Sequence, residues 1–121
     1  MNADRIRTGI ALLGELGPEA ILEWLDPDVE LLGPKPSPWD CHGRDEVVRF
    51  LDHFEPGGTR LEITEATDVG DQVLLGTRRR HPNGWVQVSF LTVSFLEGRV
   101  VLVRGFPTRD EALAELTTRS G

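Results

Sequence analysis

A chain of 121 residues has the length of one domain, and its 39% hydrophobic and 27% charged residues are typical of a globular protein rather than a disordered one. Thirteen basic residues against 20 acidic ones give a net charge of −7, which argues against nucleic acid and an anionic membrane surface as partners. The single cysteine excludes an intrachain disulfide, and the sequence lacks zinc-ligand spacing, a bilayer-length apolar run and a signal-peptide pattern. We therefore expect one cytoplasmic domain over residues 1–121, without a metal or cofactor.

The N-terminal part of the chain predicts two helices, a strand and a third helix. Apolar residues recur at the i, i+4 and i+7 positions of one helix face: Ile6, Ile10 and Leu13. Gly14 and Gly17 end this helix, and Pro18 fits the first turn of a second, short one. Residues 26–32 predict a short strand, and residues 43–54 predict an amphipathic helix. The apolar face of this last helix consists of Val47, Phe50, Leu51 and Phe54.

The second half of the chain predicts four strands, because β-branched and aromatic residues dominate four segments that turn signals separate. These segments are residues 59–69, 72–80, 85–95 and 99–106. A terminal helix follows over residues 107–116, where Thr108 and Glu111 have the spacing of a capping box. Helices at one end of the chain and an antiparallel meander at the other predict an α+β fold, with helices packed on the concave face of a curved antiparallel sheet.

The last strand is apolar on both faces. Strict alternation places Val100, Leu102, Arg104 and Phe106 on one face, and Val101 and Val103 on the other. We expect the helices to cover one of these faces. The chain provides no obvious cover for the other face, so we expect a homodimer that pairs through the outer face of the sheet.

Five stretches occur in the order and at the separations of one known family: ILEWLDPDVELLGP, GRDEVVRFL, EATDVGDQVLL, FLEGRVVLVRGF and TRDEAL. On these stretches the chain resembles the nuclear transport factor 2 superfamily, and within it the SnoaL-like branch. The resemblance covers nearly the whole chain and implies a cone-shaped, cystatin-like roll, in which helices close over a bent sheet and leave a pocket. It also implies a homodimer, and relatives that include polyketide cyclases, ketosteroid isomerase, epoxide hydrolases, dehydratases and many proteins without a known reaction.

The catalytic acids of this family do not carry over to the sequence. The aspartate base of the ketosteroid isomerase branch aligns with Gly33, and the protonated acid of its oxyanion hole falls near Leu91. The catalytic aspartate of the polyketide cyclases aligns with Pro107. None of these three side chains can transfer a proton, so the resemblance predicts the fold but none of these mechanisms.

The loop between the first strand and the next helix contains the strongest catalytic candidates, Asp40 and His42. An aspartate that orients a histidine general base is a familiar arrangement, and free histidine titrates close to neutrality. The alternative is that Asp40 only turns the chain and that His42 is exposed to solvent. Cys41 is a weaker candidate, as a nucleophile, because His42 is the sole nearby group basic enough to favour its thiolate.

Six residues are candidates for contact with a ligand: Trp39, Trp24, Phe54, Arg78, Gln87 and Arg104. Trp39 either forms a wall of an apolar pocket or packs on the underlying helix, and Trp24 is more typical of a core or rim residue. Gln87 and Arg104 interrupt otherwise apolar strands, where a buried polar side chain needs a partner. Arg104 would be a ligand contact if its strand face lines the pocket, and a dimer contact if that face is the outer one.

The run of arginines before the second turn of the meander divides between the two faces of its strand. Alternation sends Arg78 and Arg80 one way, and Arg79 and His81 the other. These arginines either pair with neighbouring acids and face solvent or, for the pair that points into the cone, hold a carboxylate or another polar ligand head.

The sequence thus predicts a pocket protein that binds or transforms a small, largely apolar molecule, because such a cone is a preformed cavity with few polar groups. An enzyme, for example a cyclase, isomerase or dehydratase, would need a titratable group inside the pocket. A non-catalytic binding protein would need only the apolar cavity and an anchoring arginine. A protein-interaction module is the remaining alternative, with the apolar second face of the sheet as its partner surface.

Overall fold

The structure is a computed structural model. It describes residues 2–16, 18–33, 40–54, 60–80 and 83–120, with side chains except at positions 13, 14, 18, 51–54, 60, 61 and 117–120. Its elements are α1 (Asn2–Leu16), the 3₁₀ helix η1 (Pro18–Trp24), β1 (Leu25–Leu32), β2 (Cys41–His42), α2 (Arg44–Phe54), β3 (Arg60–Val69), β4 (Gln72–Arg80), β5 (Val86–Leu96), β6 (Arg99–Phe106) and α3 (Arg109–Ser120). They follow the predicted order, and the short strand β2 is an addition within the predicted loop.

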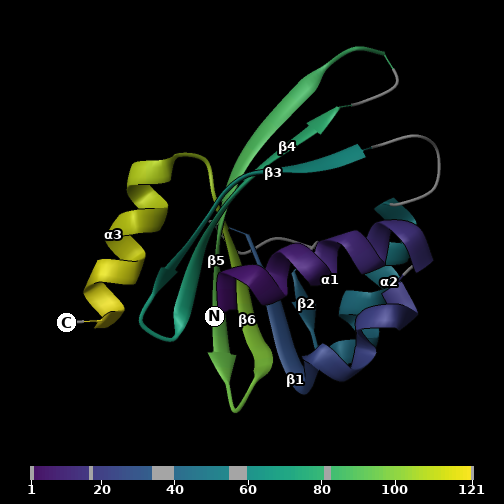
Figure 1. Cartoon of the computed structure of the whole chain (residues 1–121), viewed down its shortest axis with the longest axis horizontal. Helices are drawn as coiled ribbons and strands as arrows, with labels where there is room; N and C mark the ends of the chain where they lie inside the picture. Colours follow the sequence, from purple (N-terminus) through teal and green to yellow (C-terminus); the bar gives the residue numbers. More distant parts are fainter. Residues whose placement is uncertain (1, 17, 34–39, 55–59, 81–82, 121) are drawn as a thin grey trace.

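All six strands belong to one sheet, with the order β2-β1-β6-β5-β4-β3 (Figure 1). Strands β3 to β6 form the predicted antiparallel meander, in which each strand pairs with the next along the chain. One pairing differs from the prediction of an antiparallel sheet, because β1 lies parallel to β6. The hydrophobic pattern of a strand indicates which face is buried, but it does not encode which neighbour the strand takes or in which direction.

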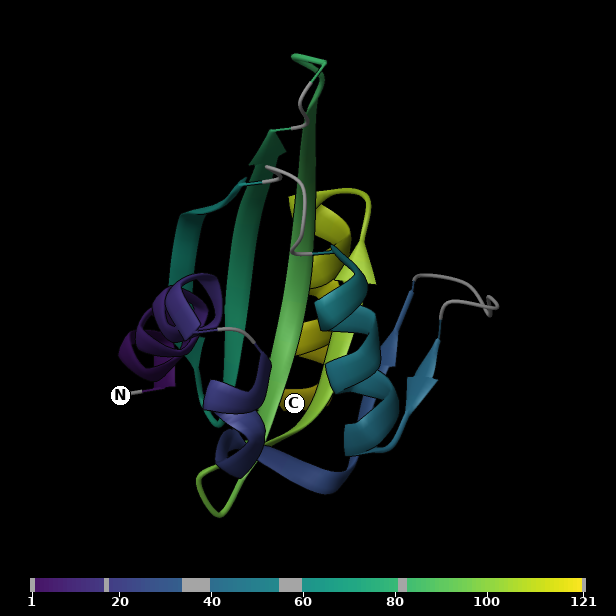
Figure 2. The ribbon, with the colours of Figure 1, turned by 90° about the vertical axis from the view of Figure 1, so that its right-hand side faces the viewer.

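Helices cover both faces of the sheet (Figures 1 and 2). The elements α1, η1 and α2 lie on one face, the concave face, and α3 packs on the opposite, outer face. On the outer face Ala112 and Leu116 of α3 pack against side chains of four strands: Val69, Leu74, Phe90 and Phe106. The prediction that the chain has no cover of its own for this face was therefore wrong, since α3 covers part of it.

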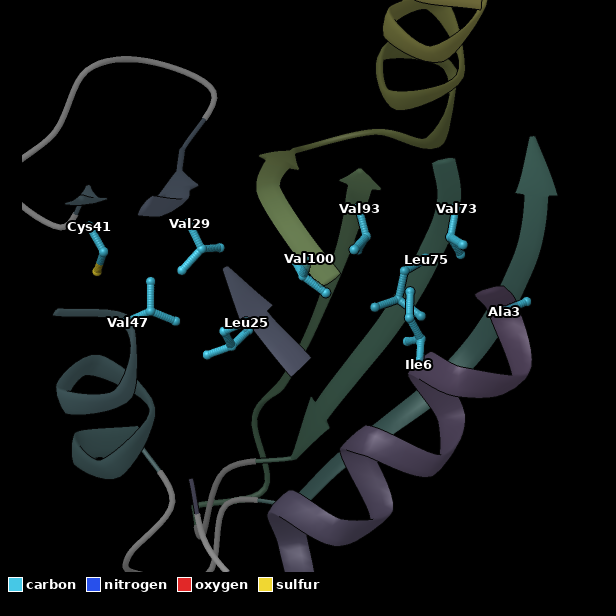
Figure 3. Close-up of a cluster of buried hydrophobic side chains, with 10 residues drawn as sticks. All are labelled: Ala3, Ile6, Leu25, Val29, Cys41, Val47, Val73, Leu75, Val93 and Val100. Carbon is cyan, nitrogen blue, oxygen red and sulfur yellow. The ribbon is translucent and has the colours of Figure 1, made fainter. Parts of the chain in front are cut away.

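The larger core lies between the concave face and its helices (Figure 3). Its buried side chains come from nearly every element on this face: Ala3, Ile6, Leu25, Val29, Cys41, Val47, Val73, Leu75, Val93 and Val100. The predicted inward positions of Ile6 in α1 and Val47 in α2 are thus confirmed. A hydrogen bond adds to the docking of α1, because the Ala3 amide donates to Asp68 Oδ1 of β3 at 3.1 Å.

Polar contacts fix α3 to the outer face at its start and near its middle. The Glu111 amide donates to Thr108 Oγ1 at 3.2 Å, which confirms Thr108 as the residue that caps the start of the helix. Arg109 donates two hydrogen bonds to the Glu65 carboxylate of β3, at 2.8 and 2.9 Å. These bonds lower the pKa of the Glu65 carboxyl, against a smaller opposite effect of burial. Farther along the helix, Glu115 accepts a hydrogen bond from Arg104 of β6.

Candidate functional site

Two neighbouring strands carry a graded ladder of side-chain pairs on the concave face. From the β3–β4 turn toward the β4–β5 turn the facing pairs are Val73–Val93, Leu75–Leu91, Thr77–Ser89 and Arg79–Gln87. Val73, Leu75 and Val93 belong to the concave core, and alternation along the strands places the rest of this ladder on the same face. The ladder therefore changes from apolar to polar along its length, and its exposure rises from buried at Val73 to exposed at Gln87.

The middle of the concave face is apolar but incompletely covered. Helix α1 packs against β3 and β4, and α2 packs against β1 and β2, so these two helices stand over the flanks of the sheet (Figure 2). Between the flanks, Leu91 of β5 and Val103 of β6 pack against the concave core and remain partly exposed. Gly105 faces Leu91 across the strands and adds no side chain. A Cβ at this glycine would lie 3.5 Å from Leu91 Cδ2, an ordinary contact.

The polar end of the ladder lies where the β4–β5 hairpin extends beyond α1 and α2 (Figures 1 and 2). Thr77 is buried, and its hydroxyl donates to the Ser89 carbonyl oxygen at 3.4 Å. The next pair on this face is Arg79, which is partly exposed, and Gln87, which is exposed. The hairpin thus presents a guanidinium and a carboxamide side by side at the rim of the apolar surface.

Asp40, one of the two predicted catalytic residues, closes the loop that precedes β2. Its Oδ1 accepts a hydrogen bond from the Gly33 amide at 3.0 Å, and the side chain is partly buried. The bond joins the end of β1 to the start of β2, so the chain-turning role considered for Asp40 is present in the structure. It also brings a carboxylate next to Gly33, the position that aligns with the base of the ketosteroid isomerase branch.

His42, the other predicted catalytic residue, pairs with a different acid from the one expected. Its Nδ1 lies 2.8 Å from Glu30 Oε2, across the β1–β2 pairing, and 63% of its side chain is exposed. Its neighbour Cys41 points into the concave core, so alternation places His42 on the outer face. The geometry therefore gives no support to a base on the concave face at this position. Sequence reasoning missed Glu30, because only strand pairing brings it to His42.

Cys41 is a poor nucleophile in this environment. The side chain is buried among the concave-core residues. Burial, followed by the negative charges of Glu46 and Asp40, raises the pKa of the Cys41 thiol. A raised thiol pKa leaves less thiolate at neutral pH, and the thiolate is the reactive form.

Both predicted ligand-binding arginines, Arg78 and Arg104, lie on the outer face. Arg78 Nε donates to Glu62 Oε2 at 3.1 Å, and Arg104 donates to Glu115 of α3 at 3.2 Å. The guanidinium of Arg104 also lies 5.8 Å from the ring centroid of Phe106. Through these contacts Arg78 connects β4 with β3, and Arg104 connects β6 with α3, both on the outer face.

The expectation that Arg104 shares a face with Val100 was wrong. The β5–β6 register shifts between Ser94 and Phe95, so the alternation along β6 is interrupted between Val100 and Leu102. Val100 consequently points into the concave core, while Phe106 packs under α3. Residues 100–103 are all apolar, so the pattern of apolar residues is the same with or without this bulge, and the sequence could not predict it.

Of the three aromatic residues predicted to contact a ligand, the structure describes the side chain of Trp24. Trp24 is partly buried and packs against α1, where the Arg5 guanidinium lies 5.3 Å from its ring centroid. A Cβ at Gly9 of α1 would come within 3.2 Å of the same ring, so glycine permits this close approach. Trp39 and the side chain of Phe54 lie outside the described residues.

Gln87 is the predicted ligand-binding residue that the structure places on the ladder, beside Arg79. Alternation separates Arg79 from Arg78 and Arg80, and both Arg78 and Arg80 contact the Glu62 carboxylate. The sequence therefore indicated that the run divides between two faces, but it could not tell which pair points inward.

Within the part of the chain that the structure describes, no three His, Cys, Asp or Glu side chains are grouped so as to hold a metal ion. Among the same residues, no helix combines the length and the apolar character that crossing a membrane requires.

Comparisons with known proteins agree with this architecture. A model of the SnoaL-like domain matches residues 6–116, and a search of curated proteins finds no significant match. An NTF2-like protein of unknown function from Mesorhizobium loti has a TM-score of 0.75 at 20% identity, over 88% of this chain and 89% of that one. TerC, co-crystallised with polyporic acid, has a TM-score of 0.70 at 23% identity, over 97% and 98% of the two chains.

A protein from Kribbella flavida DSM 17836 that has been assigned provisionally as a ketosteroid isomerase has a TM-score of 0.73 at 22% identity. The likeness covers 84% of this chain and 73% of that one. At such identities these structures establish the fold alone. Because the family model spans nearly the entire sequence, the chain belongs to the SnoaL-like domain family, within the nuclear transport factor 2 superfamily.

Proposed function

We propose that this protein binds a small, largely apolar molecule on the concave face of its sheet, between the flanks held by α1 and α2. The observation that carries the proposal is the partial exposure of Leu91 and Val103 on the two central strands. A close-packed core would bury apolar side chains in the middle of a helix-covered sheet. Apolar surface left open in such a concave place is the usual design of a small-molecule site.

The relatives support a small-molecule role at the level of the family. TerC was crystallised with polyporic acid, and the Kribbella flavida protein carries a provisional assignment to steroid isomerisation. Of the ladder residues, Arg79 is the one with an ionisable side chain, and a guanidinium stays protonated and cannot act as a base. Binding without proton transfer is therefore the function that the ladder favours.

Catalysis, for example as a cyclase, isomerase or dehydratase, is the second candidate function. It is favoured by the carboxylate of Asp40, which hydrogen-bonds the Gly33 amide and so occupies the neighbourhood of a catalytic base in related isomerases. Asp40 would then be the proton acceptor, without His42 as its partner.

A matched pair of substitutions in β5 tests the binding proposal. Leu91→Gln places a polar group on the central apolar surface, and Leu96→Gln makes the same change at a side chain that is 63% exposed. The probes are methyl biphenylcarboxylate and methyl decanoate, both neutral and largely apolar. We expect L91Q to weaken binding about fivefold to thirtyfold, the equivalent of about 1–2 kcal/mol of lost apolar contact, and L96Q to leave it unchanged.

Gly105→Val provides a second variant that adds volume to the same place. Because a Cβ at Gly105 meets only ordinary contacts, the variant should fold, and its side chain should compete with the probe. Ligand-observed NMR titrations measure the affinities, and thermal unfolding checks the fold of each variant. Equal affinities of wild type, L91Q and G105V for both esters, or no binding to the wild type, would contradict the proposal.

We also propose a cytoplasmic homodimer that pairs beside α3 on the outer face. The strip Val86, Val88 and Phe90 runs along this face of β5; the first two side chains are exposed, and Phe90 packs under α3. The cytoplasmic location is proposed because a single cysteine is typical of a protein in a reducing compartment.

A substitution on this strip tests the dimer. Val88→Glu should convert dimer to monomer in sedimentation velocity, whereas Leu96→Glu, elsewhere on the same strand, should not. A wild type that sediments as a monomer at all concentrations would contradict the dimer.

A further inference from the structure

We propose that the ligand is an amphiphilic acid, with its carboxylate held by Arg79 and Gln87 and its apolar body along Leu75 and Leu91. The inference rests on the proposed function and specifies the chemical class of the ligand. It assigns to Arg79 the role that the sequence left open between the two sides of the arginine run, and it follows from the order of side chains along the concave ladder.

The ladder has one apolar end and one polar end along a single pair of strands. The apolar pairs Val73–Val93 and Leu75–Leu91 are followed by Thr77–Ser89 and then by Arg79–Gln87. Same-face positions on a strand repeat about every 6.7 Å, so Arg79 lies about 13 Å along β4 from Leu75. A molecule with the length of a biphenyl acid or a medium-chain fatty acid spans this distance, with its head at the rim and its body over Leu91.

The face on which each arginine lies selects Arg79 as the anion-binding group. Arg78, Arg104 and Arg109 lie on the outer face, where they contact Glu62, Glu115 and Glu65. Arg79 lies on the concave face, at the polar end of the ladder.

The chemistry of the rim pair suits a carboxylate. A guanidinium presents a planar fork of N–H donors that can bind both oxygens of a carboxylate, and the Gln87 carboxamide offers further N–H donors directly opposite. Thr77 and Ser89 lie between this pair and the apolar end, so the ladder is polar from its middle to the rim. Hydrogen bonds to charged groups are stronger than neutral ones, which predicts about tenfold tighter binding of an acid than of its neutral ester.

The test compares each neutral ester with its free acid at neutral pH, on the wild type and two variants. Arg79→Gln removes the proposed anion-binding group. Arg80→Gln makes the same change at the next residue, which is exposed on the outer face near Glu62. We expect biphenylcarboxylate and decanoate to bind the wild type about tenfold more tightly than their methyl esters. R79Q should remove this preference, and R80Q should retain it.

The salt dependence provides an independent readout, because screening weakens the acid–arginine attraction and leaves ester binding nearly unchanged. If both esters bind the wild type but the acids bind no more tightly, the acid-binding role is wrong while the proposed function stands. If R79Q and R80Q reduce the acid preference equally, Arg79 is not the anion-binding residue. If neither acids nor esters bind, the proposed function fails and this inference fails with it.

Discussion

Leu116→Ala is expected to lower the free energy of unfolding by about 2–5 kcal/mol, the usual cost of removing a fully buried leucine side chain. Leu116 is 0% exposed, and it is the larger of the two described α3 side chains, Ala112 and Leu116, that are buried against the outer face. The loss includes the transfer of the removed carbon atoms to water and the cavity that remains beneath α3. Because this face has a small core of its own, there are few neighbours that could move to fill the space.

Leu113→Ala is the matched control, since it removes the same atoms from the same helix less than one turn away. Leu113 is 36% exposed, so we expect its replacement to cost about 1 kcal/mol or less. Urea unfolding followed by circular dichroism gives both values. Equal losses for the two variants would mean that α3 does not dock on the outer face in solution as it does in the structure.

Gly76→Ala is expected to destabilise the protein by about 1–3 kcal/mol, because the site has no room for a methyl group. Gly76 lies opposite the shift in the β3–β4 register between Ile63 and Glu65. A Cβ there would be 2.6 Å from Thr64 Oγ1 and 3.4 Å from Glu65 Cβ. The glycine therefore permits the bulge, and the bulge increases the bending of the sheet at this edge.

A double-mutant cycle separates this clash from the general effect of changing a glycine. Thr64→Ala removes the hydroxyl that the new methyl group would meet, and Thr64 is exposed, so alone it should cost about 0.5 kcal/mol or less. The double variant should recover most of the stability lost in G76A. Strictly additive losses in urea unfolding would show that the Thr64 hydroxyl is not the obstacle.

Most of the architecture could be predicted from the sequence because it depends on local patterns. The period of apolar residues identified α1, α2 and the four strands of the meander, and the capping signal at Thr108 marked the start of α3. The resemblance to the SnoaL-like branch agrees with the family match over residues 6–116. These features need no knowledge of which segments meet in space.

The parts that could not be predicted depend on contacts between distant segments. The side of the sheet that α3 occupies, the parallel pairing of β1 with β6 and the contact of His42 with Glu30 all follow from tertiary packing. For the same reason, the sequence could not decide which arginines of residues 78–80 point toward the concave face. Alternation separates Arg79 from Arg78, and the location of the concave core then decides between them. Trp39 and the side chain of Phe54 stay predictions.

The most direct measurement is a map of backbone amide shifts during titration with methyl biphenylcarboxylate. If central apolar side chains on the concave face are open to a guest molecule, the perturbed amides will cluster at Leu75, Leu91 and Val103, and those of Ala112 and Leu113 in α3, on the outer face, will stay unchanged. A titration that perturbs no amide up to the solubility limit of the ester, or one that perturbs only the outer face, would contradict the account.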